Sequence, residues 1–333
     1  MSYLDDIIRR AKDAPQRVAF PEANDEKMMR VAYETSELGI AFPVLVGDTQ
    51  ELKSLCKELG FDETRFEFAD MNDVDIRDKL IERYLTIPGV ILGPKALTRR
   101  MGDPLKYAFV LEAVGDVDVT IGGLNTTTGD FILAAMDIIG LQDGISAASS
   151  VGICEIQGYD GSEGNVIALA DISTRPDPTA TELADIAITS CETIRNITGW
   201  IPRCALLSFS SDGSAKHPLV DKVKEAVCCA NEKRPDLFID GEFQLDTAIV
   251  PGVAAKKVKR PSEVAGRANI IIFPDLNSGN IGVKLMQQFG GAVLYGALLQ
   301  GFKRVLSDVS RGSSVQDLVG TIALSVIIAS KKK

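Results

Sequence analysis

Residues 308–317, DVSRGSSVQD, combine an arginine, three serines and two aspartates directly ahead of the most apolar helix predicted in the chain. Ser314 and Asp317 have the spacing of a capping box, in which a hydroxyl and a carboxylate satisfy free N–H groups at a helix start. Arg311, next to the flexible Gly312, carries a planar fork of donors that suits a phosphate group. The stretch therefore predicts a helix start, and it could also bind an anion and supply a carboxylate as proton acceptor.

Three other segments follow predicted strands and are rich in small polar residues, namely 122–130, 208–217 and 273–282. Backbone N–H groups and hydroxyls at such turns suit phosphate oxygens. The same residue types also form ordinary turns and helix caps, so each segment alone is ambiguous. Loops at the carboxyl ends of strands converge, which favours a shared binding site. The candidates are Thr126, Thr127 and Thr128 in the first segment, Lys216 in the second, and Asn277, Ser278 and Asn280, just before a helix, in the third.

Histidine and cysteine chemistry receive little support. The single histidine, His217, precedes Pro218 in a helix-start setting, where a structural role is favoured. One histidine makes a histidine-based zinc site implausible and leaves one candidate for a serine–histidine triad. The six cysteines show no metal-ligand spacing and are expected to be reduced thiols in the core, so no metal site is predicted.

Charge and hydropathy narrow the class of protein further. A net charge of −10 and a pI near 4.8 argue against nucleic-acid binding. The N-terminal residues resemble an amphipathic helix and lack the apolar core of a signal peptide. The longest apolar run, 318–329, is too short to span a bilayer. We therefore expect a cytoplasmic protein without a membrane partner. The basic clusters at 94–100 and 256–260 are interpreted as solvated faces, although either could lie at the rim of a cleft.

Short apolar runs alternate with helical patterns along the chain, and 333 residues suggest two domains. The predicted fold class is α/β, with two three-layer α/β domains, mostly parallel sheets and an interdomain cleft. Residues 1–146 plus 300–333 would form the first domain, completed by the C-terminal helix, and 147–299 the second. The expected strands are 17–20, 43–47, 90–92, 117–122, 165–171, 204–210, 237–242, 269–274 and 292–296. The expected helices include 25–38, 179–197, 218–231 and 281–289.

Four segments that occur in this order along the chain form a set of motifs: SFSSDGSAKHP, IDGEFQLDTAIVP, GRANIIIFPDLNSGNIG and DVSRGSSVQDLVG. They resemble the phosphotransacetylase family, the phosphate acetyl/butyryltransferases, from about Arg17 to the C-terminus. The resemblance implies two α/β domains, a homodimer, and reversible transfer of an acyl group, by default acetyl, between coenzyme A and inorganic phosphate. Coenzyme A and an acyl phosphate would be substrates, and no metal or prosthetic group would be bound.

By the same resemblance, Asp317 corresponds to the base that takes the proton from the coenzyme A thiol. Ser310 and Arg311 correspond to residues that hold the acyl phosphate and stabilise the transition state. The residue types agree with this chemistry, since thiol attack on an acyl phosphate needs a proton acceptor, an oxyanion donor and a cation on the leaving phosphate. None of these roles requires histidine.

The sequence departs from the family pattern at three positions where arginines are expected, which here are Leu85, Leu133 and Gln288. Each lost arginine would remove a charge-assisted bond to an anion, worth about 1.5–3 kcal/mol. Arg175 could replace part of that charge. Two alternatives therefore stay open: a preference for propanoyl or butanoyl groups, and a coenzyme A-binding protein with weak or lost catalysis. A decarboxylating dehydrogenase is disfavoured, because neither a dinucleotide motif nor an aspartate cluster is present.

Overall fold

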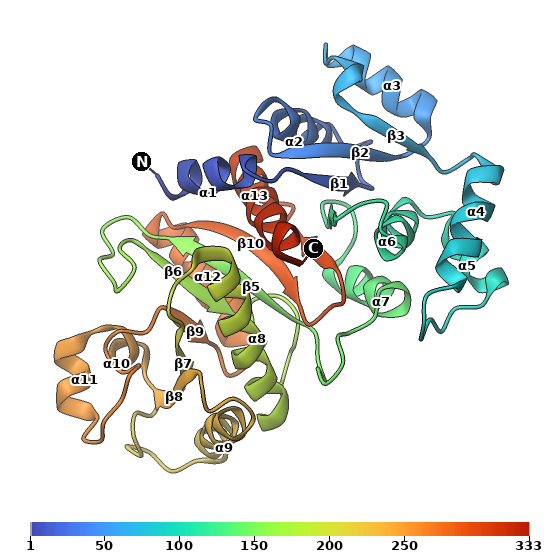
Figure 1. Ribbon diagram of the computed structural model, residues 1–333. Helices are drawn as coiled ribbons and strands as arrows, with labels where there is room; N and C mark the ends of the chain where they lie inside the picture. The colour runs from blue at the N-terminus through green and yellow to red at the C-terminus, as the bar shows by residue number, and fades with distance from the viewer. Residues whose placement is uncertain (1, 333) are drawn as a thin grey trace. The chain divides into compact units, whose positions relative to one another are not determined.

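The computed structural model describes residues 2–332 and contains two compact units. The first extends to Gln142 and resumes at Gly296, and the second is Asp143–Tyr295. The boundaries predicted from the sequence, at 146 and 299, lie a few residues further along the chain. The predicted first domain also includes residues 1 and 333, which fall outside the described part. Each unit is an α/β structure whose strands are mostly parallel, as predicted (Figure 1).

The strands of the first unit are short, and all except β3 (Glu67–Asp70) are mostly apolar and buried. They are β1 (Gln16–Phe20), β2 (Ala41–Gly47), β3, β4 (Val119–Gly122), β10 (Val293–Gln300), of which residues 296–300 belong to this unit, and β11 (Val305–Asp308). Their order is β3-β2-β1-β4-β11-β10, and neighbours run parallel except for the antiparallel pair β10 and β11. The parallel neighbours β1, β4 and β11 therefore end at the same edge, where ligand sites of α/β folds form.

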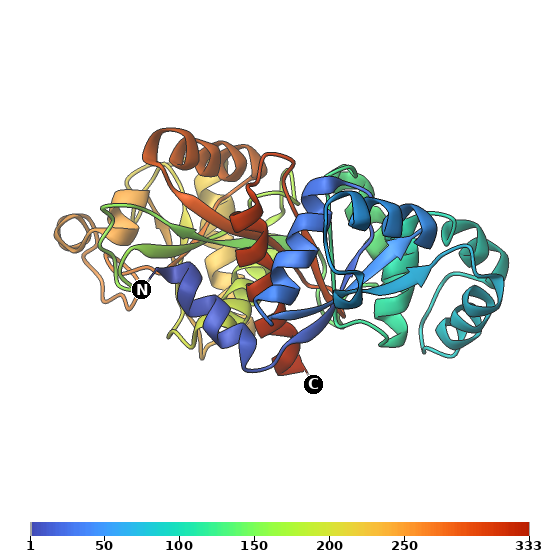
Figure 2. The same cartoon turned by 90° about the horizontal axis from the view of Figure 1, so that it is seen from above.

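Helices of the first unit pack in two groups. They are α1 (Tyr3–Lys12), α2 (Glu26–Glu37), α3 (Thr49–Glu58), α4 (Val74–Leu85), α5 (Pro94–Arg100), α6 (Pro104–Val114), α7 (Thr128–Ile138) and α13 (Val315–Lys332), with a short 3-10 turn at Glu63–Arg65. The C-terminal α13 packs against α1 and α2, while α6 packs against α4 and α7. Figure 2 shows the strands of this unit between the two groups.

The last helix, α13, is the apolar segment that the sequence predicts to be buried. Leu318, Ile322 and Leu324 are at most 1% exposed. The hydroxyls of Thr321 and Ser325 donate to carbonyls one turn back, at 2.9 and 2.8 Å, so these buried polar groups are satisfied within the helix itself. Burial of α13 fixes the helix start that follows the Ser310–Arg311 segment.

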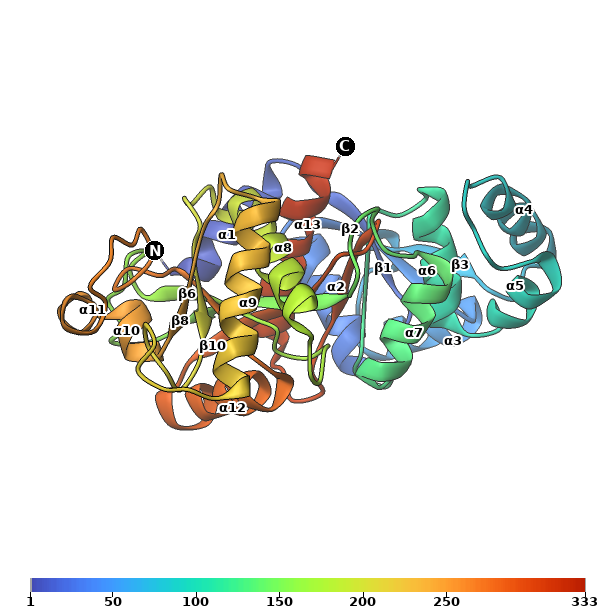
Figure 3. The same ribbon diagram turned by 90° about the horizontal axis from the view of Figure 1, so that it is seen from below.

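The second unit repeats the same architecture. Its strands are β5 (Ser149–Glu155), β6 (Val166–Ala170), β7 (Arg203–Leu207), β8 (Phe238–Phe243) and β9 (Ile270–Ile272), in the order β5-β6-β9-β7-β8. Its helices are α8 (Ala180–Thr198), α9 (Pro218–Lys233), α10 (Leu245–Ile249), α11 (Pro251–Lys257) and α12 (Leu276–Gly290). Strand β5 is antiparallel to β6, and the other pairs are parallel. Figure 3 shows α8 and α9 packed side by side, as their contacts require.

Several predicted elements are wrong in detail. Residues 90–92 are not a strand but part of the connection between α4 and α5. That apolar run is too short to distinguish a strand from a loop that packs against a helix. The strands β3, β5 and β11 are absent from the prediction, because polar or small residues interrupt their apolar pattern. Helix α12 begins at Leu276, five residues before the predicted 281, since Asp275 caps it through Ser278 N–H.

Cysteine placement corrects a second expectation. Cys56, Cys154, Cys191 and Cys204 are buried free thiols, as predicted, but Cys228 is exposed and Cys229 is half-buried. Both lie on the outer side of α9, so they do not belong to the core. Within residues 2–332, no helix is long and apolar enough to cross a membrane.

Candidate active site

The capping box predicted at the start of α13 is present. The backbone N–H of Ser314 donates to Oδ2 of Asp317 at 2.8 Å, and the backbone N–H of Asp317 donates to Ser314 Oγ at 3.2 Å. The second carboxylate oxygen of Asp317, Oδ1, has no hydrogen-bond partner among the described residues. Asp317 is half-buried. One residue therefore anchors the helix and still carries a free acceptor.

Ser310 and Arg311 lie in the exposed turn between β11 and α13. The Ser310 hydroxyl accepts a 3.3 Å hydrogen bond from Gly312 N–H. The guanidinium of Arg311 is exposed and has no partner within residues 2–332. An unpaired cation beside a hydroxyl provides the two donors that an acyl phosphate needs. Ser310, Arg311 and Asp317 thus lie within eight residues of one another on a single turn and helix start.

Lys27 on α2 also holds this turn. Its Nζ donates to the carbonyl oxygens of Arg311 and Ser313, both at 3.1 Å. Asp25 caps α2 and thereby sets where Lys27 lies on the helix. An ammonium group on two carbonyls of one turn restricts the turn's conformation and adds a positive charge beside Arg311.

The threonine-rich loop after β4 does not offer its donors to solvent. The carboxylate of Glu22, which follows β1, accepts five hydrogen bonds from this loop. The backbone N–H groups of Gly123, Leu124, Asn125 and Thr126 donate at 2.9, 2.7, 3.1 and 2.9 Å, and the Thr126 hydroxyl donates at 2.9 Å. Glu22 is 5% exposed. The predicted phosphate cradle is therefore filled by an internal carboxylate, and Thr126 is engaged by it.

The other two threonines of the loop also have partners. Thr127 caps α7, accepting from Asp130 N–H at 3.2 Å and donating to the Asp130 carboxylate at 2.7 Å. Thr128 donates to Oδ2 of Asp308 at 2.6 Å. Asp308 ends β11 and is 5% exposed. Burial raises the pKa of Asp308 to about 6, opposed by the Thr128 bond and assisted by the nearby charge of Glu22.

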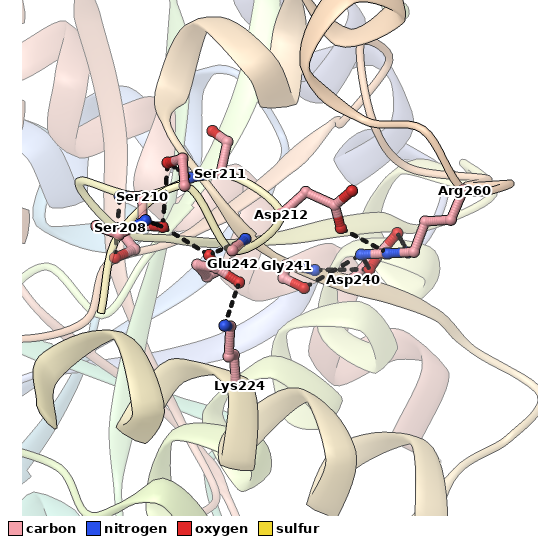
Figure 4. Close-up of polar contacts among 12 residues, drawn as sticks. Ser208, Ser210, Ser211, Asp212, Lys224, Asp240, Gly241, Glu242 and Arg260 are labelled. Atoms are coloured by element: carbon pink, nitrogen blue, oxygen red, sulfur yellow. Dashed lines mark hydrogen bonds and ion pairs between the residues drawn. The ribbon is translucent and has the colours of Figure 1, made fainter. Parts of the chain in front are cut away.

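The serine-rich loop after β7 has the same internal arrangement in the second unit (Figure 4). Glu242, 1% exposed, accepts from the Ser210 hydroxyl at 2.7 Å and from Gly213 N–H at 2.8 Å. Lys224 on α9 lies 4.0 Å from its other oxygen. Donors of loop 208–215 are again turned onto a buried glutamate. In both units, the N–H groups and hydroxyls of a loop rich in Gly, Ser and Thr thus bind a buried glutamate of the protein itself.

The candidates of the second unit are placed differently from one another. Lys216 is exposed, and its ammonium has no partner within the described part of the chain. Asn277 is exposed and its side chain is likewise unpaired there, whereas Asn280 donates to the Ile172 carbonyl at 3.2 Å. Both asparagines lie inside α12, not before it, which corrects their predicted setting. Asn280 therefore ties the helix to the segment that follows β6.

The positions that depart from the family pattern carry no cation. Leu133 on α7 is 67% exposed, Gln288 on α12 is exposed, and Leu85 is half-buried at the end of α4. Arg175, considered as a replacement cation, forms an ion pair with Glu182 at the start of α8. Its charge is therefore already engaged.

One arginine of each basic cluster forms ion pairs within the protein, and the histidine caps a helix. Arg260 bridges Asp212 at 2.9 Å and Asp240 at 2.7 Å (Figure 4). In the first cluster, Arg100 pairs with Asp137. His217 caps α9, its Nδ1 accepting from Leu219 N–H at 3.2 Å, and its ring packs against Phe209.

Four residues near these loops are not predicted from the sequence: Glu22, Lys27, Asp308 and Glu242. Three of them are acidic residues in or just after a strand, a position that could have marked them. Their partners lie far away in the sequence, however, since Glu22 meets Leu124 and Asp308 meets Thr128. Among residues 2–332, no group of three or more His, Cys, Asp or Glu residues is arranged to hold a metal ion.

Comparisons with known proteins identify the family. Residues 2–326 match the family described as phosphate acetyl/butaryl transferase. A phosphate acetyltransferase of Clostridium acetobutylicum is 38% identical, with 99% of each chain covered.

Solved structures agree. A phosphotransacetylase from Streptococcus pyogenes is 33% identical, with a TM-score of 0.90 over 99% of this chain and 100% of that one. A EutD phosphotransacetylase from Staphylococcus aureus is 30% identical, with a TM-score of 0.87 and complete coverage of both chains. The chain therefore belongs to the phosphate acetyl/butaryl transferase family.

Proposed function

We propose that this protein is an acyltransferase that moves an acetyl group reversibly between coenzyme A and inorganic phosphate. Full-length similarity to phosphate acetyltransferases supports the reaction. The observation that carries the mechanism is the arrangement of Ser310, Arg311 and Asp317 at the end of β11, with an unpaired guanidinium and a free carboxylate oxygen.

In the direction of thioester formation, Oδ1 of Asp317 accepts the proton of the coenzyme A thiol as the sulfur attacks the acetyl carbonyl. The hydroxyl of Ser310 donates to the oxyanion that develops there. Arg311 binds the phosphate, whose bond to the acetyl carbon breaks. The phosphate leaves with the bonding electron pair and later takes the proton from Asp317, which restores the enzyme. The proposed steps use no metal or prosthetic group.

Binding of the substrates would draw on residues whose polar groups are unpaired. We propose Lys216 and Asn277 in the second unit as contacts for substrate, because their side chains have no partner within the described chain. For Asn280 and for Thr126, Thr127 and Thr128, we propose a supporting role, since their side chains already hold the protein's own loops.

A second hypothesis is that the protein prefers a longer acyl group or catalyses the transfer only weakly. Leu133 presents an exposed apolar side chain where an arginine is expected. Such a surface favours a longer acyl group or weaker phosphate binding over tight acetyl phosphate recognition. A coenzyme A-binding protein with weak catalysis is therefore the second candidate.

A direct assay separates these readings. Purified protein is mixed with coenzyme A and acetyl, propanoyl or butanoyl phosphate, and thioester is followed by its ultraviolet absorbance. We expect turnover with acetyl phosphate at least equal to that with the longer substrates. Faster turnover with propanoyl or butanoyl phosphate would move the assignment to that acyl group. Absence of turnover with all three, with coenzyme A binding retained in calorimetry, would reduce the protein to a binding role.

We further propose a cytoplasmic homodimer of chains with two domains, corresponding to the two compact units. All six cysteines are free thiols, a state typical of reducing compartments. Helix α12 exposes Ile281, Leu285 and Phe289, one turn apart on one face, at 56, 50 and 86%. An apolar stripe of this kind is typical of a subunit interface.

A further inference from the structure

We propose that Asp308 is a positioning residue for acyl transfer, which through its hydrogen bond with Thr128 holds the Ser310–Arg311 turn against the start of α7. The inference rests on the proposed function and extends it to residues that do not touch substrate. Asp308 ends β11 two residues before Ser310, so any displacement of its carboxyl group is passed directly to the turn.

The carboxyl group of Asp308 is confined on both sides. Its Oδ2 accepts the 2.6 Å bond from the Thr128 hydroxyl. Its Oδ1 is buried without a hydrogen-bond partner among the described residues and lies against Gly123, where a Cβ atom would stand only 2.3 Å away. Gly123 also adopts a φ of 113°, which favours glycine. The strand end and the loop after β4 therefore approach as closely as backbone permits.

The loop that contacts Asp308 is itself immobilised. The five bonds to Glu22 order its first residues, and Val309 N–H donates to Gly122 O at 2.8 Å, directly ahead of Ser310. A continuous series of contacts thus runs from Glu22 through the loop to Thr128, Asp308 and the turn. Lys27 on α2 independently holds the carbonyls of the same turn.

Protonation should weaken this support. Burial holds the pKa of Asp308 at about 6, and Glu22 is the charged group that acts on it from the loop side. A hydroxyl donates more strongly to a carboxylate than to a neutral carboxyl group. Below pH 6, the Thr128 bond weakens and Ser310 and Arg311 lose alignment. A shift of about 1 Å in reacting groups can cost up to about 100-fold in rate.

The test compares Thr128→Val, Thr128→Ser and Asp308→Asn with wild type, measuring kcat and KM for acetyl phosphate and coenzyme A from pH 5 to 8. Thr128→Val should lower kcat about tenfold with little change in KM, and it should flatten the acid limb, because the bond that protonation of Asp308 weakens is already absent in this variant. Thr128→Ser restores the hydroxyl and should restore kcat. Asp308→Asn should abolish the acid limb.

Thr35→Val is the matched control. Its hydroxyl is buried and donates to Ala32 O in α2 at 2.9 Å, so the same substitution there should leave kcat and its pH profile unchanged. Wild-type kcat and an unchanged profile in Thr128→Val would overturn the proposal, as would a serine variant no better than valine. Asp308→Asn keeps an oxygen that can accept from Thr128. If Thr128→Val does not fold, the pH profile of kcat in Asp308→Asn therefore tests the proposal, and an acid limb that persists there would overturn it.

An error in the proposed function would be visible in the wild-type protein and not in the variants. If wild type shows no transfer with any acyl phosphate, the reaction assignment fails. The role of Asp308 in holding the Ser310–Arg311 turn is then tested by amide hydrogen exchange. Exchange should be faster at residues 309–313 in Thr128→Val than in Thr35→Val. Equal exchange in the two variants would reject it.

Discussion

Asp317 accepts the Ser314 N–H through Oδ2 at 2.8 Å and leaves Oδ1 without a partner among the described residues. A carboxylate fully committed to backbone N–H groups would be a poor proton acceptor. Because only one of the two oxygens is committed to the helix start, Asp317 avoids that conflict. The same cap keeps the carboxylate in a fixed orientation, which is a requirement for efficient proton transfer.

Replacement of Asp317 by Asn should lower kcat at least about tenfold, since general base catalysis typically contributes more than that. The amide oxygen can still accept the cap hydrogen bond, so the fold should be retained. Initial rates of thioester formation provide the measurement. Ser314→Ala serves as the comparison for lost capping, with an expected cost of about 0.5–2 kcal/mol in the free energy of unfolding. Wild-type rates in Asp317→Asn would remove this residue from the mechanism.

Replacement of Glu22 by Gln should destabilise the first unit by about 2–4 kcal/mol. The amide offers one acceptor oxygen to five donors, and hydrogen bonds to a charged group contribute about 1.5–3 kcal/mol each without adding fully. Urea denaturation measures the loss. Glu26→Gln is the control, because Glu26 forms an exposed pair with Arg30 and should change stability by less than about 0.5 kcal/mol. Equal stability of both variants would contradict the importance of the Glu22 contacts.

Stability should fall as pH rises from about 4.5 to 8 because of Glu112 on α6. Burial raises the pKa of this carboxyl group from 4.5 to about 8, although Oε1 accepts from Val305 N–H at 2.9 Å. A raised pKa means that the folded protein holds the proton more tightly, so this stabilisation is present at low pH and lost as pH passes 8.

The Glu112 effect should be on the order of 5 kcal/mol, since the pKa rises from 4.5 to about 8 and each pKa unit corresponds to about 1.4 kcal/mol. Denaturation curves of wild type and Glu112→Gln from pH 4.5 to 9 measure it, with the exposed Glu58→Gln as control. The glutamine variant should become the more stable protein at the alkaline end. The same dependence of the free energy of unfolding on pH in wild type and Glu112→Gln would contradict the expected titration of Glu112.

Replacement of Lys27 by Met should lower kcat about tenfold, because it frees the carbonyls of Arg311 and Ser313 and removes a cation from the turn. Rates at low and high salt distinguish the two effects, since a lost long-range attraction would diminish in high salt. Arg30→Met, one turn along α2, removes an equal charge that pairs with Glu26. An equal loss of rate in both variants would argue against a specific clamp.

Charged substitutions on α12 should disrupt the proposed homodimer. Leu285→Asp and Phe289→Asp place a carboxylate within the apolar stripe and should yield monomers in sedimentation velocity experiments. Ile91→Asp, at an equally exposed apolar position of the first unit, should leave the association state unchanged. A dimer that persists in both α12 variants would place the subunit interface elsewhere.

The sequence by itself determined the local features of this protein. The capping box of Ser314 and Asp317 joins residues three apart, and α2, α8 and α9 follow caps and apolar periodicity within single segments. Segment order and residue types also indicated the family, which the comparisons confirm. Such features follow from the sequence because backbone geometry alone brings the interacting groups together.

Tertiary structure decided what the polar loops do. Glu22 lies 102 positions from Leu124, and Asp308 lies 180 from Thr128. Their contacts exist because β1, β4 and β11 are parallel neighbours that end at one edge of the sheet. A loop rich in Gly and Thr is equally suited to an external phosphate and to an internal carboxylate, because its donors are the same in both cases. Only the strand order, set by packing of helices over a buried sheet, determined which anion those donors meet.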